Sequence, residues 1–325
     1  MDLALIFLRR LSHAVLLVLA VLVLNFLLIH LAPGDPADVI AGEMGGATEE
    51  MLAEIRELYG LNKPVIVQLG IYLGRAVQGD LGQSFFYNAP VSELILGRIG
   101  PTILLVTAAL SFAIFVGTFL GVLASYKPKG FLSGFVTLFA VIGYSAPIFW
   151  TGLMLVIVFA WLIPVFPISG MYDVTLDNGP VGRVLDILHH LILPALTLGI
   201  VYIAQYARLT RASMLEILGS DYIRTARAKG VSGPKIYGYH ALRNAIIPIV
   251  TIAGLQFGSV VSGAVLVETV FSWPGLGTLA FDSILARDYP TVLGILFFSA
   301  VLVIVANLIT DIVYRFVDPR IRTGG

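Results

Sequence analysis

Long uncharged hydrophobic runs recur along the chain and alternate with shorter polar segments. A bilayer core about 30 Å thick needs about 20 apolar residues in a helix, so each run predicts a transmembrane helix. Six runs occur, at residues 11–31, 103–126, 135–163, 191–207, 245–271 and 292–314. The pattern predicts an all-α integral membrane protein with six transmembrane helices, the third of them tilted or kinked.

The first run follows Arg9 and Arg10, as the apolar core of a secretory signal peptide would. It is long for such a core, however, and ends at residues 31–35 without the small-residue cleavage pattern. We therefore expect an uncleaved first span over residues 1–31, with its short N-terminal tail.

Composition agrees with a bilayer location, because 58% of the 325 residues are hydrophobic, 12% are charged and the mean hydropathy is +0.93. The chain has no cysteine, which excludes disulfides and thiol nucleophiles on this chain. A formal net charge of zero gives no indication of nucleic-acid binding.

The basic residues are distributed unevenly between the two sides. With the N-terminus in the cytoplasm, 14 Lys and Arg residues fall inside and 6 outside. This bias follows the positive-inside rule and predicts that both termini are cytoplasmic.

The segment 32–101 is the largest extramembrane piece and is predicted to be extracytoplasmic. Thr48 and the following acidic residues, an apolar periodicity and then Gly60 predict a capped amphipathic helix. After Pro64, the sequence pattern predicts a second helix at residues 65–77, which is too short and polar to span a membrane.

The segment between the fourth and fifth spans is the most informative for function. Ser220 or Asp221 is expected to cap a short cytoplasmic helix, and Gly230 is expected to end it in the left-handed conformation. A second helix start at Ser232, Gly233 and Pro234 would lead into the fifth span.

Two interpretations of this cytoplasmic helix stand side by side. A basic loop could simply fix topology and bind anionic head groups. Small residues at its tip (Ala226, Ala228 and Gly230) and flanking arginines instead suit close docking of another protein. The candidate docking residues are Asp221, Tyr222, Arg224, Thr225, Ala226, Arg227, Ala228, Lys229 and Gly230.

Motifs spread over nearly the whole chain resemble one known family. They lie at residues 33–36, 79–84, 209–214, 222–230, 241–245, 268–277, 287–290 and 318–322. The chain is similar to the permease subunits of ABC importers, most of all to the dipeptide, oligopeptide and nickel permeases. It departs from the general cytoplasmic motif at Arg224, where that motif has glutamate.

The resemblance implies a type I ABC importer permease fold at residues 102–325, with a coupling helix at about 221–230. It implies two cytoplasmic ABC ATPase subunits carrying ATP and Mg, a homologous second permease and an extracytoplasmic solute-binding protein. The chain would lie among the lipids of a bacterial or archaeal cell membrane and form half of a pathway for peptides. Dipeptides, oligopeptides, glutathione-like compounds and nickel chelates all stay open as substrates.

Polar side chains within the spans either join helices or face a wet pathway, since lipid cannot satisfy them. Those in the predicted spans include Asn25, Gln205, Gln256, Ser259, Ser262, Glu268, Asn307 and Asp311. Gln256, Ser259, Ser262 and Glu268 are the pathway or gate candidates. Glu268 is equally compatible with a structural hydrogen-bonding role.

Two other function classes have less support from the sequence. An intramembrane hydrolase built on Ser145 would need a general base, yet every histidine lies near a span end or in the cytoplasmic segment. An ion-driven transporter would need clustered acidic or basic residues within the spans, and the predicted spans lack them. Neither a catalytic nor a metal site is expected, and the chain has no Gly-Lys dipeptide and therefore no Walker-type phosphate loop.

Overall fold

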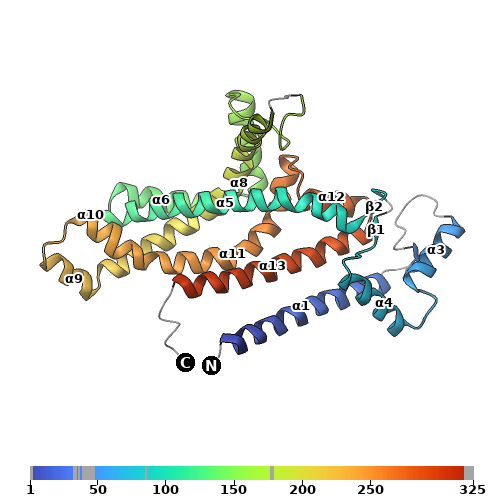
Figure 1. Ribbon diagram of the computed structural model, residues 1–325. Helices are drawn as coiled ribbons and strands as arrows, with labels where there is room; N and C mark the ends of the chain where they lie inside the picture. The colour runs from blue at the N-terminus through green and yellow to red at the C-terminus, as the bar shows by residue number, and fades with distance from the viewer. Residues whose placement is uncertain are drawn as a thin grey trace. The chain divides into compact units, whose positions relative to one another are not determined.

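The computed structural model describes residues 3–31, 35, 37–38, 48–84, 86–175 and 179–317. Within these ranges the chain is mostly helical (Figure 1). Four described helices are long and apolar enough to cross a membrane: Ser12–Leu31, Val91–Tyr126, Gly179–Leu218 and Tyr289–Ile309. An all-α membrane protein is therefore confirmed, whereas the count of six spans stays a prediction.

The chain divides into two compact units, Met1–Thr102 with Pro274–Leu308, and Ile103–Trp273 with Ile309–Gly325. The first unit contains α1 (Leu3–Leu31), α3 (Glu49–Tyr59), α4 (Val65–Val77), β1 (Gln83–Ser84), β2 (Ala89–Pro90), α12 (Leu276–Leu285) and most of α13 (Tyr289–Val317). The second contains most of α5 (Val91–Tyr126), α6 (Phe131–Ser145), α7 (Ile148–Val156), α8 (Gly179–Leu218), α9 (Asp221–Ala228), α10 (Gly233–Lys235) and α11 (Leu242–Val270). It also has π-helices η1 (Ile157–Leu162) and η2 (Ile236–Ala241).

The two helices predicted outside the membrane form as expected. The hydroxyl of Thr48 accepts a 3.3 Å bond from the Met51 amide at the start of α3, and Gly60 ends the helix at φ +66°. α4 begins after Pro64. Gln68 on α4 donates to the carbonyls of Leu61 and Lys63 and accepts from His30 Nε2 at 2.7 Å, which joins α4 to the end of α1.

Two carboxylates stabilise turns in the segment between α1 and α5. The amide of Ala37 and the guanidinium of Arg56 hold the pKa of Asp35 below its ordinary value. Burial raises the pKa of Asp80, but hydrogen bonds from Arg75 and the Gly82 amide lower it by more, so its net shift is also downward. Both side chains therefore stabilise the folded protein most when they are ionised.

The short β1–β2 pairing leads into α5. The first residues of α5 pack against α12 and α13. Val91, Ile95, Leu276, Leu279 and Ile295 form a buried cluster there. Ser84 on β1 reaches the start of α13, where its hydroxyl donates to Asp288. The first unit is thus held together by segments about 200 residues apart in sequence.

In the second unit, close approach of α5 to α8 depends on glycine. A Cβ at Gly117 would meet the Tyr206 Cβ at 2.6 Å, and one at Gly121 would meet the Thr210 Cβ at 2.5 Å. Small residues four apart allow two helix backbones to approach in a bilayer, where apolar burial alone gives little driving force. These glycines set the spacing of the two helices.

The third apolar run does not form one continuous helix. α6 ends at Ser145, Ala146 takes an extended conformation at φ −77° and ψ 131°, and α7 begins after Pro147. Proline has no amide hydrogen and disfavours helical geometry in the residue before it. The expected kink is therefore a break. α5 and α8 also extend well beyond their apolar runs, to 36 and 40 residues.

Candidate functional site

The cytoplasmic segment predicted to dock a partner folds as the short helix α9. It ends in a Schellman motif, because the Gly230 amide donates to the Arg227 carbonyl and the Val231 amide to the Ala226 carbonyl. Gly230 has φ +77°, a conformation that glycine adopts without the usual steric cost. The predicted helix end is confirmed.

Capping at the start of α9 differs from the prediction. Ser220 occupies the N-cap position, but its hydroxyl donates to the Ile217 carbonyl at 2.6 Å and caps no amide of α9. Asp221 accepts a 3.4 Å bond from Arg224, three residues along the helix. Side-chain capping by Ser220 is therefore wrong. The hydroxyl instead closes the turn after α8.

α9 has one buried apolar side chain and is joined to the following helix by hydrogen bonds. Ile223 is fully buried while its neighbours on α9 are exposed. The Tyr222 hydroxyl donates to the His240 carbonyl at 3.3 Å and accepts from Asn244 at 2.9 Å. α9 is thus attached to η2 and to the start of α11.

The second helix start, at Ser232 and Pro234, forms where expected and runs through α10 into η2. η2 is a π-helix that the sequence did not predict. Its Tyr237 ring stacks on Tyr126 at the end of α5, with centroids 3.9 Å apart and planes 8° from parallel. This stack explains why the irregular turn is held in place: it joins α5 to the segment that carries α9.

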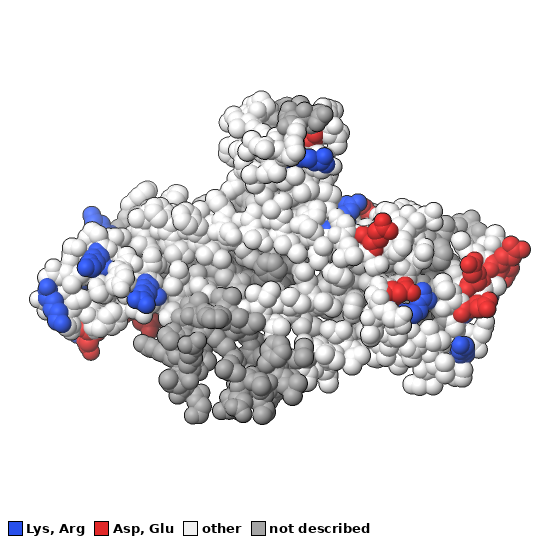
Figure 2. Space-filling model, in the orientation of Figure 1, with Lys and Arg blue, Asp and Glu red and all other residues white. Residues whose placement is uncertain are grey.

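The tip of α9 is exposed and basic. Arg227, Ala228, Lys229 and Gly230 are all exposed, and a Cβ at Gly230 would meet nothing within 4 Å. On the face drawn in Figure 2, Lys and Arg side chains gather over this end of the second unit. A partner's acidic cleft could therefore approach the tip closely.

Among the pathway candidates, Gln256 has two defined hydrogen-bond partners on α8. It accepts a 2.6 Å hydrogen bond from the Tyr206 hydroxyl and donates a 2.6 Å bond to Gln205. Ser259 and Ser262 belong to α11, but their side chains lie outside the described part of the chain. The side chain of Glu268 is fully buried inside the second unit, which favours its structural role over a position on a pathway wall.

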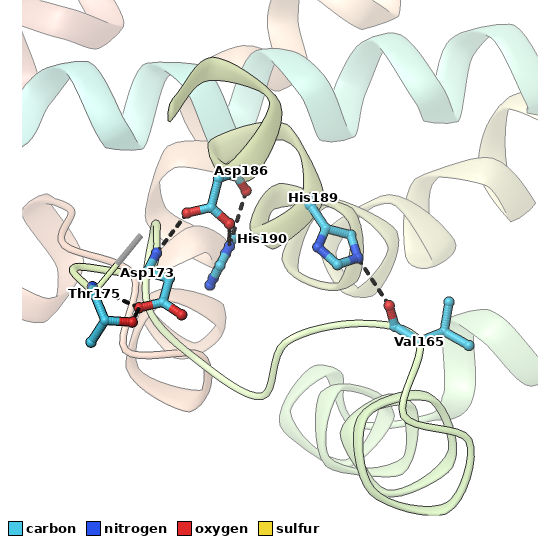
Figure 3. Close-up of polar contacts among 6 residues, drawn as sticks. All are labelled: Val165, Asp173, Thr175, Asp186, His189 and His190. Carbon is cyan, nitrogen blue, oxygen red and sulfur yellow. Dashed lines mark hydrogen bonds and ion pairs between the residues drawn. The ribbon is translucent and has the colours of Figure 1, made fainter. Parts of the chain in front are cut away.

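The loop between η1 and α8 is organised by polar contacts (Figure 3). Asp186 accepts from the Asp173 amide at 2.6 Å and pairs with His190 at 3.1 Å. The neighbouring His189 instead bonds the Val165 carbonyl at 2.9 Å. The two histidines thus have separate partners, and the described residues contain no group of three metal-ligating side chains.

Ser145 is exposed at the end of α6, and the described residues include no hydrogen bond from it to a histidine. The geometry that nucleophilic catalysis needs is therefore not assembled around it in this part of the chain.

Comparison with known proteins adds independent information. Residues 117–323 match the family described as binding-protein-dependent transport system inner membrane component. Residues 3–107 match the N-terminal region of the same group of membrane components. Together the two matches span almost the whole chain.

Curated relatives are similar along their full length. A probable peptide ABC transporter permease of Sinorhizobium fredii is 42% identical over 97% of this chain and 98% of its own. The dipeptide transport system permease of Escherichia coli K12 is 41% identical with the same coverage. A di/tripeptide permease of Pseudomonas aeruginosa is 42% identical over 97% of both chains.

A solved structure shares the fold. A chain from an inward-facing crystal form of the MetNI methionine ABC transporter aligns with a TM-score of 0.55 and 17% identity. The alignment covers 69% of this chain and 96% of that chain.

Proposed function

Because this chain belongs to the family of binding-protein-dependent transport system inner membrane components, we propose that it is the peptide-conducting permease subunit of an ABC importer. Its relatives in three bacteria are named for peptides, dipeptides or di- and tripeptides. Short peptides are accordingly the substrate. The chain is a multi-pass membrane protein and acts as a transport subunit. It forms half of the pathway, beside a homologous second permease.

α9 is the element that receives the motion of the ATPases, and its geometry is the observation that carries this assignment. Tyr222 attaches the helix to η2 and α11 and Ile223 is fully buried, while the tip of the helix is exposed, basic and lined by small side chains. Movement of a cleft around the tip would therefore displace the helices that follow. ATP and Mg bind on two partner subunits.

Arg224 gives this contact an unusual polarity. Its side chain is 73% exposed, and among the described residues it pairs with the exposed carboxylate of Asp221. An ion pair this exposed contributes little to stability, so the guanidinium is available to a partner carboxylate. We expect an acidic residue on the ATPase surface that faces the first turn of α9.

The topology follows from the same charges. Basic residues at α9 and its surroundings belong on the cytoplasmic side by the positive-inside rule, which places both termini there too. α3 and α4 then lie outside, where an extracytoplasmic solute-binding protein delivers the peptide to the cell membrane.

Purification of the tagged chain from its native membranes tests this function. We expect ABC ATPases and a second permease to co-purify, and the complex to hydrolyse ATP and take up a dipeptide in proteoliposomes when the solute-binding protein is added. A pure, ATPase-free chain that still transports would contradict the proposal and favour an ion-driven transporter.

A further inference from the structure

A directional chain of hydrogen bonds joins the middle of α8 to α11. The Tyr206 hydroxyl donates to Gln256 Oε1, and Gln256 Nε2 donates to Gln205 Oε1, both at 2.6 Å. Tyr206 is fully buried, and the tight approach of Gly117 to its Cβ fixes its position. The first group of the chain is therefore rigid.

The last group of this chain is the amide nitrogen of Gln205. Since the Gln205 oxygen already accepts from Gln256, the amide nitrogen keeps both of its N–H donors for another acceptor. Among the described residues, nothing accepts from this nitrogen, and the side chain is only half-buried. Gln205 lies near the end of the predicted fourth span, where lipid tails offer no acceptor, so its donors need an acceptor from water, a partner or a solute.

Arg208 lies on the same face of α8, three residues further on. Helical residues three apart are about 5–6 Å apart at their Cβ atoms. The Arg208 side chain is exposed and has no ion-pair or hydrogen-bond partner among the described residues. Half-buried Gln205 and exposed Arg208 thus place hydrogen-bond donors about one turn apart on one face of the helix.

We propose that Gln205 and Arg208 bind the peptide as it leaves the pathway, with the Gln205 amide donating to a peptide carbonyl and Arg208 to the carboxylate. This inference rests on the proposed function, since it assigns residues to the passage of a peptide. Each hydrogen bond in a chain polarises the next, so the Tyr206 and Gln256 bonds strengthen the Gln205 donors. Arg208 offers a planar fork that matches a carboxylate.

The selectivity expected from this pair follows from its chemistry. Carbonyl groups occur in every peptide bond and a carboxylate at every free C-terminus, whereas side chains vary. Donors aimed at these shared groups would bind peptides of different sequence equally. The pair therefore accounts for passage of many peptides through one site.

Kinetic measurements on the reconstituted importer test the role of Gln205. With a radiolabelled dipeptide, we expect Gln205→Leu to lower the kcat/KM of uptake about tenfold. This is the usual effect of removing one hydrogen bond from a protein donor to a polar solute. Tyr206→Phe should lower it only about two- to threefold, since the terminal amide stays. Val201→Leu, one turn away on the same helix, is the control for bulk and should leave uptake unchanged.

Gln205→Glu decides the direction of the contact, because it keeps the shape but replaces donors with acceptors. We expect a loss at least as large as that of Gln205→Leu. Uptake at the normal rate in Gln205→Glu would overturn the proposal. So would loss of the second permease from purified Gln205→Leu complexes, which would make the amide a contact between subunits.

Trapping provides a readout independent of rate. Because the chain has no cysteine, Gln205→Cys or Arg208→Cys introduces its only thiol. A dipeptide carrying a thiol-reactive group should label both variants only with ATP and solute-binding protein present. Ala204→Cys, at a buried position, and Phe115→Cys, at an exposed position on α5, should stay unlabelled.

Equal labelling of Gln205→Cys and Phe115→Cys, or labelling without ATP, would overturn the proposal. The wild type separates this result from failure of the proposed function. If the wild-type importer takes up no peptide, the substrate class itself is wrong. If it does and Gln205→Leu is normal, only the assignment of these residues fails.

Discussion

Ser84 donates a 2.6 Å hydrogen bond to Asp288 across 204 residues of sequence, and both side chains are buried. The same hydroxyl accepts from the Tyr87 amide at 3.0 Å, and Asp288 also accepts from Thr291 in the first turn of α13. One carboxylate therefore caps α13 and holds the β1 turn against it.

Removing this hydroxyl should destabilise the first unit. Hydrogen bonds to charged groups contribute about 1.5–3 kcal/mol, so Ser84→Ala should cost up to that amount and lower the thermal midpoint of the purified protein. Ser145→Ala removes an exposed hydroxyl without a hydrogen-bond partner among the described residues and serves as the control. Identical midpoints for the two variants would show that Ser84 contributes nothing.

Acid should weaken the segment between α1 and α5. Asp35 and Asp80 both have a lowered pKa in the folded protein, so their stabilisation is present above the ordinary value of 3.8 and is lost as the pH falls through the folded values. At pH 6, the double variant Asp35→Asn, Asp80→Asn should melt earlier than the wild type. The difference should begin to shrink below about pH 3.8 and disappear only once the pH is below the lowered folded-state pKa values, where the wild-type carboxylates are protonated.

A matched pair of variants distinguishes this effect from general acid sensitivity. Glu50 and Glu57 are exposed residues of α3 whose carboxylates have no hydrogen bond among the described residues, so Glu50→Gln, Glu57→Gln removes the same charge and serves as the control at each pH. A gap between wild type and the aspartate variant that is constant with pH would contradict the assignment to Asp35 and Asp80.

The contact between α5 and α8 should tolerate no larger residue at Gly121. A Cβ there would also lie 2.6 Å from the Ala207 carbonyl oxygen, and that backbone cannot move aside. Gly121→Leu should therefore destabilise the second unit by about 1–3 kcal/mol, the usual cost of overpacking, or prevent assembly altogether. Gly134→Leu on α6, where nothing lies within 4 Å of the Cβ position, should behave as wild type in thermal melts.

Bulk at the tip of α9 should uncouple transport from ATP hydrolysis. Gly230→Trp has open space in this chain, so the protein should reach the membrane, but the indole would block close docking. We expect peptide uptake to fall at least tenfold while ATP hydrolysis no longer responds to the solute-binding protein. Gly230→Asn tolerates the positive φ with less bulk and should retain most coupling.

The same large side chain on α4, which belongs to the first unit, is the control for this experiment. Gly74→Trp adds an indole to exposed α4, where nothing lies within 4 Å of the Cβ position, and should leave coupling intact. Normal coupled uptake by Gly230→Trp would exclude the tip of α9 as the docking surface.

Local signals in the sequence were sufficient for the short helices. Thr48, Gly60 and Pro64 predicted the bounds of α3 and α4, and Gly230 predicted the end of α9, because each signal acts within one turn. Long-range features could not be obtained this way. The Ser84–Asp288 bond and the Tyr206–Gln256–Gln205 chain depend on which helices meet, and no local pattern encodes that.

Two errors have specific physical causes. Ser220 is a good N-cap residue by type, but the Ile217 carbonyl at the end of α8 competes for its hydroxyl. The π-helix η2 has no compositional signal and is held by the stacking of Tyr237 on Tyr126.

The sequence motifs at residues 33–36 and 318–322 lie almost wholly outside the described residues, apart from Asp35.

A π-turn holds one more residue than the α-turn it replaces, so η2 shifts the angular phase of the chain by about 100°. A helical wheel drawn continuously from Pro234 through α11 would therefore assign every later side chain to the wrong face. Conversely, deleting one residue of η2 could restore ordinary helix while rotating α11 relative to α9. η2 thus determines the face of α11 on which Gln256 lies.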